Sequence, residues 1–304
     1  MTERITGIFN ILATPFDANQ AVDYDSLRRL VNFQINMGTD GLTILGVLGE
    51  AAKLNVEERQ AVMQTVIETN VGRVPIVVGT SHADFDTCVA LSKSALDAGA
   101  EGVMIAPPRM PEASDDDIFD LYQRLAGRIE APIVVQDYPK INDTYMSPKV
   151  IARIAEQLPH CRYLKLEDPP LMEKTTAILE RTDKIKIFGG LGGMFLLEEL
   201  KRGTSGTMTG FAFTEILVGI FQAFNSGDEA RATAIFDRYL PLIRFENQPE
   251  INLTIRKELL YRRGAIANAN PRKPFIEIDS GTQDEISWVL ERVGISDPTQ
   301  AIIL

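Results

Sequence analysis

The stretch Gly99-Ala100-Glu101-Gly102-Val103-Met104-Ile105 has two counterparts elsewhere in the chain, Gly38–Ile44 and Gly203–Thr209. In each copy, two glycines three residues apart precede an apolar run. The first glycine can end a helix in the left-handed conformation, and the second can begin a strand where a side chain would obstruct packing. The recurrence favours a repeated helix–strand unit over chance, although the chain contains 22 glycines.

Short apolar runs extend this pattern along most of the chain. They are rich in leucine or β-branched residues and lack strict alternation, which is typical of strands covered on both faces. Amphipathic stretches of helical length, such as Ser26–Met37 and Asp84–Ala98, lie between them. We expect strands at Asn10–Thr14, Gly41–Leu45, Pro75–Gly79, Gly102–Ala106, Pro132–Gln136, Tyr163–Glu167, Ile185–Gly189 and Gly206–Gly210.

Eight strand–helix units in strict alternation predict an α/β fold, a (β/α)8 barrel with a closed parallel sheet. An open two-layer α/β sheet is the alternative, but the phosphate-binding G-x-G-x-x-G fingerprint is missing after the first strand. After the eighth strand only helical patterns follow, at Thr214–Asn225, Asp228–Arg244, Glu250–Arg263 and Thr282–Val293.

The chain contains no Pro/Gly/Ser-rich linker. We therefore expect residues 1–225 to form the barrel and residues 226–304 to form a helical extension packed on it, rather than an independent domain. Within that extension, the pairs Arg256-Lys257 and Arg262-Arg263 predict a solvated basic face.

Composition narrows the functional classes. The chain has 304 residues and a formal net charge of -11, which disfavours binding to nucleic acid or to a membrane surface. No apolar run approaches the roughly 18 residues needed to cross a bilayer. Two isolated cysteines, Cys88 and Cys161, are typical of a cytosolic protein. Neither His82 nor His160 has a second ligand at metal spacing, so we expect no metal site.

Tyr163-Leu164-Lys165-Leu166-Glu167 places a lysine in the sixth expected strand, between two leucines. Keeping a lysine charged among apolar side chains is costly, which favours the neutral amine. A neutral amine attacks a ketone and forms an imine, whose protonated form is an electron sink. The alternative is a lysine that reaches solvent or pairs with Glu167. Because active sites of such barrels lie at the C-terminal ends of the strands, the catalytic interpretation is favoured.

The loop Gly46-Val47-Leu48-Gly49-Glu50 follows the second expected strand. Its glycines permit a tight turn, which leaves the backbone N–H groups of Val47 and Leu48 available to an anion. A carboxylate bound there would lie at the top of the barrel. Because every barrel has turns of this kind, the loop alone is a weak indication.

Together these features resemble the dihydrodipicolinate synthase/N-acetylneuraminate lyase family, from about Ile8 to Gly264. The resemblance implies a TIM barrel with a C-terminal helical segment, usually tetrameric, whose members form a lysine Schiff base with a 2-oxo acid and need no cofactor. The Gly46–Glu50 loop matches the family's G-T-T-G-E at both glycines and at the glutamate. Lys165 matches the Schiff-base lysine, and Gly206–Thr209 matches a segment beside the substrate.

The departures from the family pattern concern its proton relay. Pro139 matches the proline of the family's Y-N-V-P motif. In this alignment Gln136 occupies the position of the family's catalytic tyrosine, and Tyr138 occupies the position where the family has a valine. A glutamine cannot replace a tyrosine as acid or base. We expect Tyr138 to substitute only if the strand is twisted or bulged. Val47 and Leu48 replace the two threonines of the family motif. Arg109 is the nearest match to the position where the family has a second tyrosine of the relay. Because the relay is largely missing, dihydrodipicolinate synthase activity is not expected.

We therefore expect a cytoplasmic lyase that acts on a 2-oxo acid as an aldolase or a dehydratase and assembles as a homo-oligomer, a tetramer or a dimer. Lys165 is the expected nucleophile, with Gln136 and Tyr138 as its catalytic neighbours. The small 2-oxo acid is the only expected partner. The expected substrate-binding residues are Gly46, Val47, Leu48, Glu50, Arg109, Gly189 and Met208.

Several alternatives remain open from the sequence. Bound water, Glu50 or the substrate's own groups could carry the protons that the missing tyrosine would carry. Arg109 is equally consistent with binding a distal anionic group and with a surface position. A non-catalytic protein that binds a 2-oxo acid is the alternative function, and a metal-dependent barrel aldolase is a third class that the two lone histidines disfavour.

Overall fold

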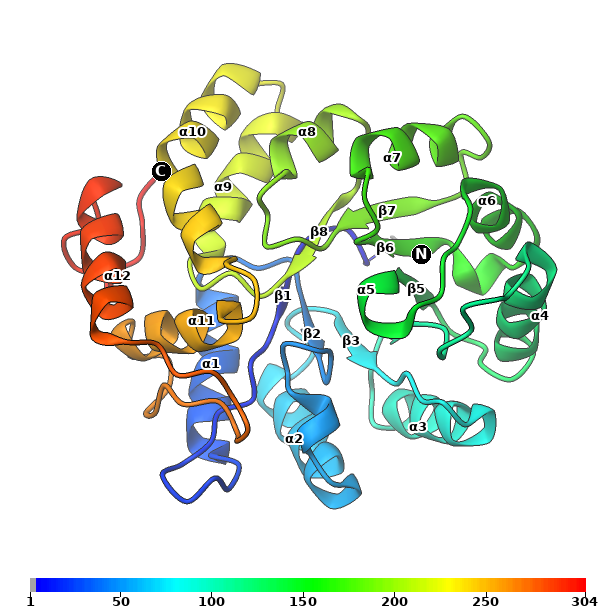
Figure 1. Cartoon of the computed structure of the whole chain (residues 1–304), viewed down its shortest axis with the longest axis horizontal. Coiled ribbons are helices and arrows are strands. Elements are labelled where there is room, and N and C mark those ends of the chain that lie inside the picture. Colours follow the sequence, from blue (N-terminus) through cyan, green and yellow to red (C-terminus); the bar gives the residue numbers. More distant parts are fainter. Residues whose placement is uncertain (1–3) are drawn as a thin grey trace.

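Eight parallel strands close into a barrel in chain order, β1 to β8, in the computed structural model, which describes residues 4–304 (Figure 1). A helical segment follows each strand and lies outside the sheet, so the predicted (β/α)8 barrel is confirmed. The strands are β1 Gly7–Ile11, β2 Gly41–Ile44, β3 Ile76–Gly79, β4 Gly102–Ile105, β5 Ile133–Asp137, β6 Tyr163–Leu166, β7 Lys186–Gly189 and β8 Gly206–Thr209.

The prediction for the first strand was wrong by three residues. The strand spans Gly7–Ile11 instead of Asn10–Thr14. Its first residue pairs with Gly206 of β8, and the Asp40 carboxylate accepts a hydrogen bond from the backbone of Ile8 at 2.8 Å. These partners, distant in sequence, fix where the strand begins. The other seven predicted strands agree with the structure to within one residue at each end.

The outer helices begin at residues that cap them. Asp23, Asn55, Asp84, Ser114 and Ser147 each accept a backbone hydrogen bond from the first turn of the helix that follows. The helices around the barrel are α1 Tyr24–Asn36, α2 Val56–Asn70, α3 Phe85–Asp97, α4 Asp115–Ala126, α5 Pro139–Asn142, α6 Pro148–Gln157, α7 Leu171–Leu179, α8 Leu196–Lys201 and α9 Thr214–Asn225, with 3-10 turns at Ala51–Lys53 and Pro159–Cys161.

The repeated glycines have the roles that their spacing predicts. Gly38, Gly99 and Gly203 all have positive φ, between 84° and 107°. At Gly102 an added Cβ would lie 2.6 Å from a backbone oxygen, and at Gly206 it would lie 1.9 Å from one. Each unit therefore ends its helix in the left-handed region and begins its strand where only glycine fits.

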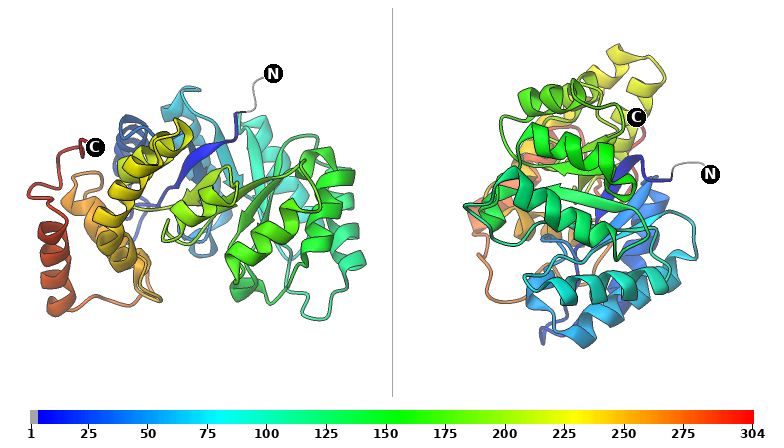
Figure 2. Two further views of the ribbon diagram at one scale, coloured as in Figure 1. Left: turned by 90° about the horizontal axis from the view of Figure 1, so that it is seen from above. Right: turned by 90° about the vertical axis from the view of Figure 1, so that its right-hand side faces the viewer.

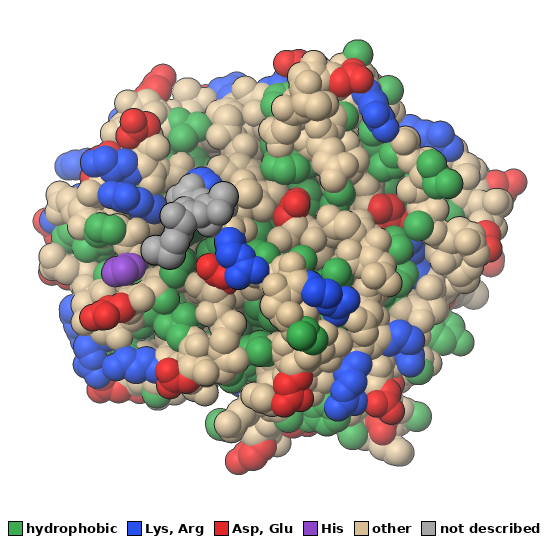
Figure 3. Space-filling model, turned by 180° about the vertical axis from the view of Figure 1, so that it is seen from behind, with side chains coloured by type: hydrophobic (Ala, Val, Ile, Leu, Met, Phe, Trp, Pro, Cys, Tyr) green, Lys and Arg blue, Asp and Glu red, His purple; other side chains and the backbone are tan. Residues whose placement is uncertain are grey.

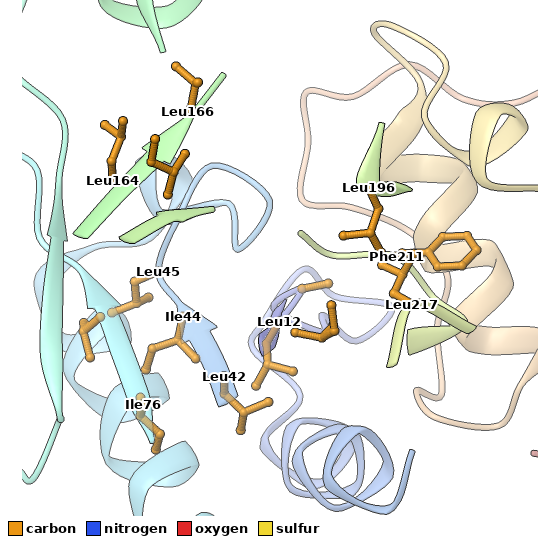
Figure 4. Packing of buried hydrophobic residues seen from close by; sticks show 14 of the residues in the cluster. Leu12, Leu42, Ile44, Leu45, Ile76, Leu164, Leu166, Leu196, Phe211 and Leu217 are labelled. Carbon is orange, nitrogen blue, oxygen red and sulfur yellow. The ribbon is translucent and has the colours of Figure 1, made fainter. Parts of the chain in front are cut away.

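Two apolar cores lie on the two sides of the sheet. The larger core lies between the strands and the helices, and it includes Leu164 and Leu166, which lie together on β6 (Figure 4). The smaller core fills the barrel interior and consists of Ile5, Phe9, Val77, Met104, Val134, Tyr163, Phe188 and Met208. Since side chains alternate along a strand, the two leucines face the helices, whereas Lys165 faces the barrel interior.

The C-terminal extension contains α10 Glu229–Glu246, α11 Asn252–Arg262 and α12 Ser280–Arg292. Figures 1 and 2 show these helices on one side of the barrel, beside α1 and α9. Apolar residues of α10, α11 and α12, such as Phe236, Leu259 and Val289, belong to the same buried cluster as the outer face of the barrel. The extension therefore shares the core of the barrel.

The prediction of a solvated basic face on α11 was wrong. Arg256, Lys257 and Arg263 are at most 3% exposed. Each of them forms an ion pair of 2.6 Å with a buried carboxylate. Arg256 pairs with Glu246, Lys257 with Glu50 and Arg263 with Glu215. All three carboxylates lie outside α11, so the local sequence of that helix does not reveal the pairing. The extension is attached to the barrel through buried charges as well as apolar contacts.

Between residues 4 and 304, no helix is both long enough and apolar enough to traverse a lipid bilayer. Cys88 and Cys161 are free and buried. Figure 3 shows the face that bears the N-terminal end, where acidic and basic side chains are interspersed among apolar ones. That face presents no large area of a single charge.

Candidate active site

A cavity of about 880 Å³ opens where the strands end at their C-terminal side. Its walls come from the segments after β2, β5, β6 and β7, from the end of β8 and from the start of α11. Active sites of this fold lie at this end of the barrel. Its lining includes Val47, Leu48, Gln136, Tyr138, Lys165 and Glu167.

Lys165 lies on the cavity wall with its side chain only 5% exposed. Its Nζ atom is 2.8 Å from Oε2 of Glu167, whose side chain is also 5% exposed. Gln136 is the direct neighbour of Lys165 in the ladder between β5 and β6, and its Nε2 donates to the same Glu167 oxygen at 2.8 Å. A buried amine, a carboxylate and an amide therefore form one cluster at the mouth of the barrel.

Glu167 is a site residue that was not predicted from the sequence. The only role expected for this carboxylate was to pair with a structural Lys165. The signal was present, because residues two apart in a strand face the same side. A lysine in the interior therefore brings Glu167 into the interior with it.

The two adjacent glycines at the end of β7 leave space for two different carboxylates. A Cβ on Gly190 would lie 2.4 Å from Cγ of Glu167, so only glycine leaves space for the carboxylate against β7. Gly189, on the other side of the same strand, leaves space for Glu199 of α8. A Cβ added to Gly189 would lie only 2.0 Å from Oε2 of Glu199. Gly189 was predicted to contact the substrate, but its neighbour Gly190 lines the cavity.

The Gly46–Glu50 turn places Val47 and Leu48 on the cavity wall, as predicted. The turn closes through backbone hydrogen bonds from Gly49 to Gly46 at 3.1 Å and from Glu50 to Val47 at 3.0 Å. Within residues 4–304, the N–H groups of Val47 and Leu48 have no hydrogen-bond acceptor, so both groups are available to a carboxylate. Gly46 supports the turn without lining the cavity.

Glu50 does not line the cavity. Its side chain is 1% exposed and lies beneath the turn, 2.6 Å from Nζ of Lys257 and 2.9 Å from Nζ of Lys53. Burial lowers the pKa of Lys257 to about 8, against the opposing effect of Glu50. Glu50 therefore connects the turn to α11 and is not placed where it could transfer a proton to a substrate.

Tyr138 lines the cavity without any bulge in the strand. Strand β5 ends at Asp137, and Tyr138 is the residue that precedes α5. The expectation that a twist or bulge would be required was wrong, since Gln136 and Tyr138 are two residues apart and alternation places them on the same side. Burial raises the pKa of the Tyr138 hydroxyl, with a smaller contribution from the nearby Glu167.

Two further expected residues lie away from the cavity. Met208 is fully buried in the interior core, where it pairs in register with Phe9. Arg109 is 70% exposed and its guanidinium is 2.7 Å from the Asp143 carboxylate on the surface. Between residues 4 and 304, no group of three or more His, Cys, Asp or Glu residues could hold a metal ion.

Comparisons with known proteins agree with this geometry. The model of the Dihydrodipicolinate synthetase family matches residues 4–293. The chain is 35% identical to L-2-keto-3-deoxyarabonate dehydratase of Azospirillum brasilense, with 96% of each protein covered. It is 28% identical to 4-hydroxy-tetrahydrodipicolinate synthase of Pseudomonas aeruginosa, with 78% of this chain and 82% of that protein covered. A crystal structure of dihydrodipicolinate synthase from Rhodopseudomonas palustris superimposes with a TM-score of 0.90, at 36% identity and with 96% of this chain and 99% of that chain covered.

Together with this geometry, the matches identify a lyase of the class I aldolase type, which acts on a 2-oxo acid through a lysine Schiff base. The chain belongs to the dihydrodipicolinate synthetase family.

Proposed function

We propose that the enzyme dehydrates a 3-deoxy-2-oxo sugar acid of the L-2-keto-3-deoxyarabonate type and that Lys165 is its Schiff-base lysine. The observation that carries this proposal is the contact of 2.8 Å between Lys165 Nζ and Glu167 Oε2. The similarity to a dehydratase over 96% of both proteins supports dehydration in preference to aldol cleavage. Because Gln136 occupies the position of the family's catalytic tyrosine, Glu167 takes over the proton transfers.

The proposed reaction begins when the Lys165 amine attacks the C2 carbonyl and water leaves as the imine forms. Glu167 accepts a proton from the amine and returns it to the departing hydroxyl. The protonated imine acidifies C3, so Glu167 can remove a proton there and form an enamine. The enamine then expels the C4 hydroxyl, which leaves as water after it takes up that proton. Hydrolysis of the imine releases the dehydrated product and frees the amine.

The substrate carboxylate binds at the N–H groups of Val47 and Leu48 in this proposal. Backbone donors do not depend on the side chain, so the loss of the family's two threonines leaves this function intact. Gln136 holds Glu167 in position through its hydrogen bond of 2.8 Å. The Tyr138 hydroxyl faces the same cavity and can contact the hydroxyls at the far end of the substrate.

We also infer that the enzyme works in the cytoplasm as a homo-oligomer, a dimer or a tetramer. The two free buried cysteines are typical of a protein in a reducing compartment such as the cytoplasm. The family resemblance supports assembly into a homo-oligomer. Light scattering measures the mass of the assembly, and a single monomeric species at micromolar concentration would contradict this inference.

Borohydride reduction tests the proposed lysine. Incubation with pyruvate or L-2-keto-3-deoxyarabonate, followed by reduction and peptide mass mapping, is expected to give an adduct on Lys165. Lys165→Met should abolish the adduct, whereas Lys140→Met, which alters an exposed lysine of the same cavity, should retain it. An adduct on another lysine would disprove the assignment, and turnover that releases pyruvate without loss of water would disprove dehydration.

A further inference from the structure

Three acidic residues meet where β5 and β6 end. Asp137 is the last residue of β5, and Glu167 and Asp168 directly follow β6. The backbone oxygen of Asp137 accepts a hydrogen bond from the N–H of Glu167 at 2.9 Å. Glu167 and Asp168 line the cavity, whereas the fully buried side chain of Asp137 faces the surrounding helices, since side chains alternate along a strand. Like charges this close destabilise one another unless a cation compensates them.

Lys174 supplies that cation from the beginning of α7. Its side chain is 8% exposed, and its Nζ atom lies 2.5 Å from Oδ2 of Asp137 and 2.7 Å from Oδ2 of Asp168. Within residues 4–304, no other cation pairs with either carboxylate. A buried carboxylate that loses its counter-charge is strongly destabilising. One ammonium group therefore connects the end of β5 to the segment after β6.

The two carboxylates that Lys174 binds are direct neighbours of residues at the reaction centre. Asp137 follows Gln136, and Asp168 follows Glu167. Gln136 donates at 2.8 Å to the Glu167 oxygen that also contacts the reactive amine. A displacement of about 1 Å in such a group can lower a rate about 10²-fold. In the part of the chain that the structure describes, neither Asp137 nor Lys174 lines the cavity, so both can influence the reaction only through these neighbours.

We propose that Lys174 is a positioning residue, which holds the ends of β5 and β6 at the spacing where Glu167 meets both Gln136 and the reactive amine. This role rests on the proposed function, because it concerns the carboxylate to which the proton transfers are assigned. Lys174 does not touch the substrate and takes up no proton in the reaction. Its charge holds Asp137 and Asp168 beside each other, and the backbone hydrogen bond between Asp137 and Glu167 extends that constraint to the reaction centre.

Substitution of Lys174 should lower turnover in sites that still form the imine. Lys174→Met should reduce kcat for dehydration of L-2-keto-3-deoxyarabonate about tenfold or more, with a smaller change in KM because the Gly46–Glu50 turn is untouched. Exhaustive borohydride trapping of pyruvate on Lys165 counts the competent sites, and kcat is expressed per trapped site. A lysine that only stabilised the fold would reduce the number of trapped sites and leave kcat per site unchanged. Lys174→Arg, which can still bridge both carboxylates, should recover most of the loss.

Lys201→Met on α8 is the matched control. The side chain of Lys201 is 52% exposed, and its ammonium lies 3.5 Å from the Glu229 carboxylate on the surface. Because this pair is remote from the reaction centre in the chain and open to solvent, its loss should leave kcat per trapped site unchanged.

Asp137→Asn tests the same constraint from the other partner, and it does so even if Lys174→Met does not fold. The amide keeps the shape of the side chain but weakens its attraction to Lys174, so kcat per site should fall at pH 7.5. In the wild type, burial raises the pKa of Asp137 to about 6, against the opposing effect of Lys174 and with smaller contributions from Asp168 and Glu167. The buried hydroxyl of Tyr122 on α4 also lies nearby. The wild-type kcat should therefore fall more steeply between pH 7.5 and pH 5.5 than the kcat of Asp137→Asn.

The outcomes separate the positioning role from the proposed function. Normal kcat per trapped site in Lys174→Met and Asp137→Asn, no recovery in Lys174→Arg, or the same fall with pH in Asp137→Asn as in the wild type would overturn the positioning role alone. Absence of a borohydride adduct on Lys165 of the wild type would overturn the proposed function, and the positioning role with it.

Discussion

At the scale of single residues, the spacing of Lys165 and Glu167 determines the chemistry that the cavity can perform. Two residues apart on β6, both side chains face the interior, and their charged atoms meet at 2.8 Å. A lysine among leucines predicts the nucleophile by itself. The role of Glu167 requires knowing which side of the strand faces the cavity, which only the closed barrel shows.

Replacing this carboxylate separates imine formation from turnover. Glu167→Gln should lower kcat by about 10²–10⁴-fold, because an amide cannot accept the C3 proton. Borohydride trapping of pyruvate on Lys165 should become slower, because Glu167 also transfers protons during imine formation, but an adduct should still form. Steady-state assays of dehydration measure the loss of kcat. Glu173→Gln, which alters an exposed carboxylate of α7, is the matched control. A Glu167→Gln enzyme with a normal kcat would remove Glu167 from the mechanism.

The buried Glu199 carboxyl predicts a pH dependence of stability. Burial raises its pKa to about 8, with smaller contributions from Glu198 and Glu167. Folding therefore favours the protonated form, and the resulting stability is lost as the pH rises from about 4.5 towards 8. The slope is at most about 1.4 kcal/mol per pH unit in this window. Urea unfolding measures the free energy of unfolding at pH 5 and at pH 8. The difference between the two values should be smaller for Glu199→Gln than for the wild type.

Glu285→Gln, on the exposed face of α12, is the control for that experiment. The Glu285→Gln variant should show the same difference in the free energy of unfolding between pH 5 and pH 8 as the wild type. If Glu199→Gln retains the same difference as the wild type, Glu199 does not titrate in this range.

At the scale of elements, α11 supports the Gly46–Glu50 turn, where we propose that the substrate carboxylate binds. Lys257 is fully buried, and its ammonium is 2.6 Å from Glu50 at the end of that turn. The same ammonium lies 4.4 Å from the centre of the Phe16 ring, after β1. One buried lysine thus connects α11 to two loops at the mouth of the barrel.

Loss of that lysine should affect both stability and binding. Lys257→Met leaves Glu50 buried with only Lys53 as a charged side-chain partner, so we expect a loss of about 3–5 kcal/mol. The KM for the 2-oxo acid should rise because the turn shifts. Lys53→Met, which removes the more exposed partner of the same carboxylate, should cost less. Denaturant titration and steady-state kinetics measure the two effects, and equal costs for both variants would contradict this ranking.

At the scale of the whole molecule, the barrel and the C-terminal extension share one buried core. Apolar side chains of α10, α11 and α12 join the cluster that covers the outer face of the strands. The buried pairs Lys257–Glu50 and Arg263–Glu215 add charged contacts between the extension and the barrel. We therefore propose that residues 226–304 do not fold as a separate domain.

The single tryptophan offers a direct test of that proposal. Trp288 lies on α12, so its fluorescence reports the extension, whereas far-ultraviolet circular dichroism reports the whole chain. Both signals should change at the same denaturant concentration, as expected for one cooperative unit. A fluorescence transition at clearly lower denaturant would show that the extension unfolds independently of the barrel.

The barrel and the order of its strands could be predicted from the sequence alone, and the sequence also singles out Lys165 as the candidate Schiff-base lysine. These features follow from local periodicity, from glycines at fixed points of a repeated unit and from one lysine in an apolar strand. Seven strands were placed to within one residue, while β1 was misplaced because Asp40 and Gly206, both distant in the chain, define its start.

Only the tertiary structure decided which charged residues serve the site. The structure shows that Glu50 lies beneath the turn, that Arg109 lies on the surface and that Glu167 contacts Lys165. The physical reason is that burying a charge is costly unless a partner of opposite charge compensates it. Most of these partners come from segments far apart in the chain, and they meet only when the barrel closes.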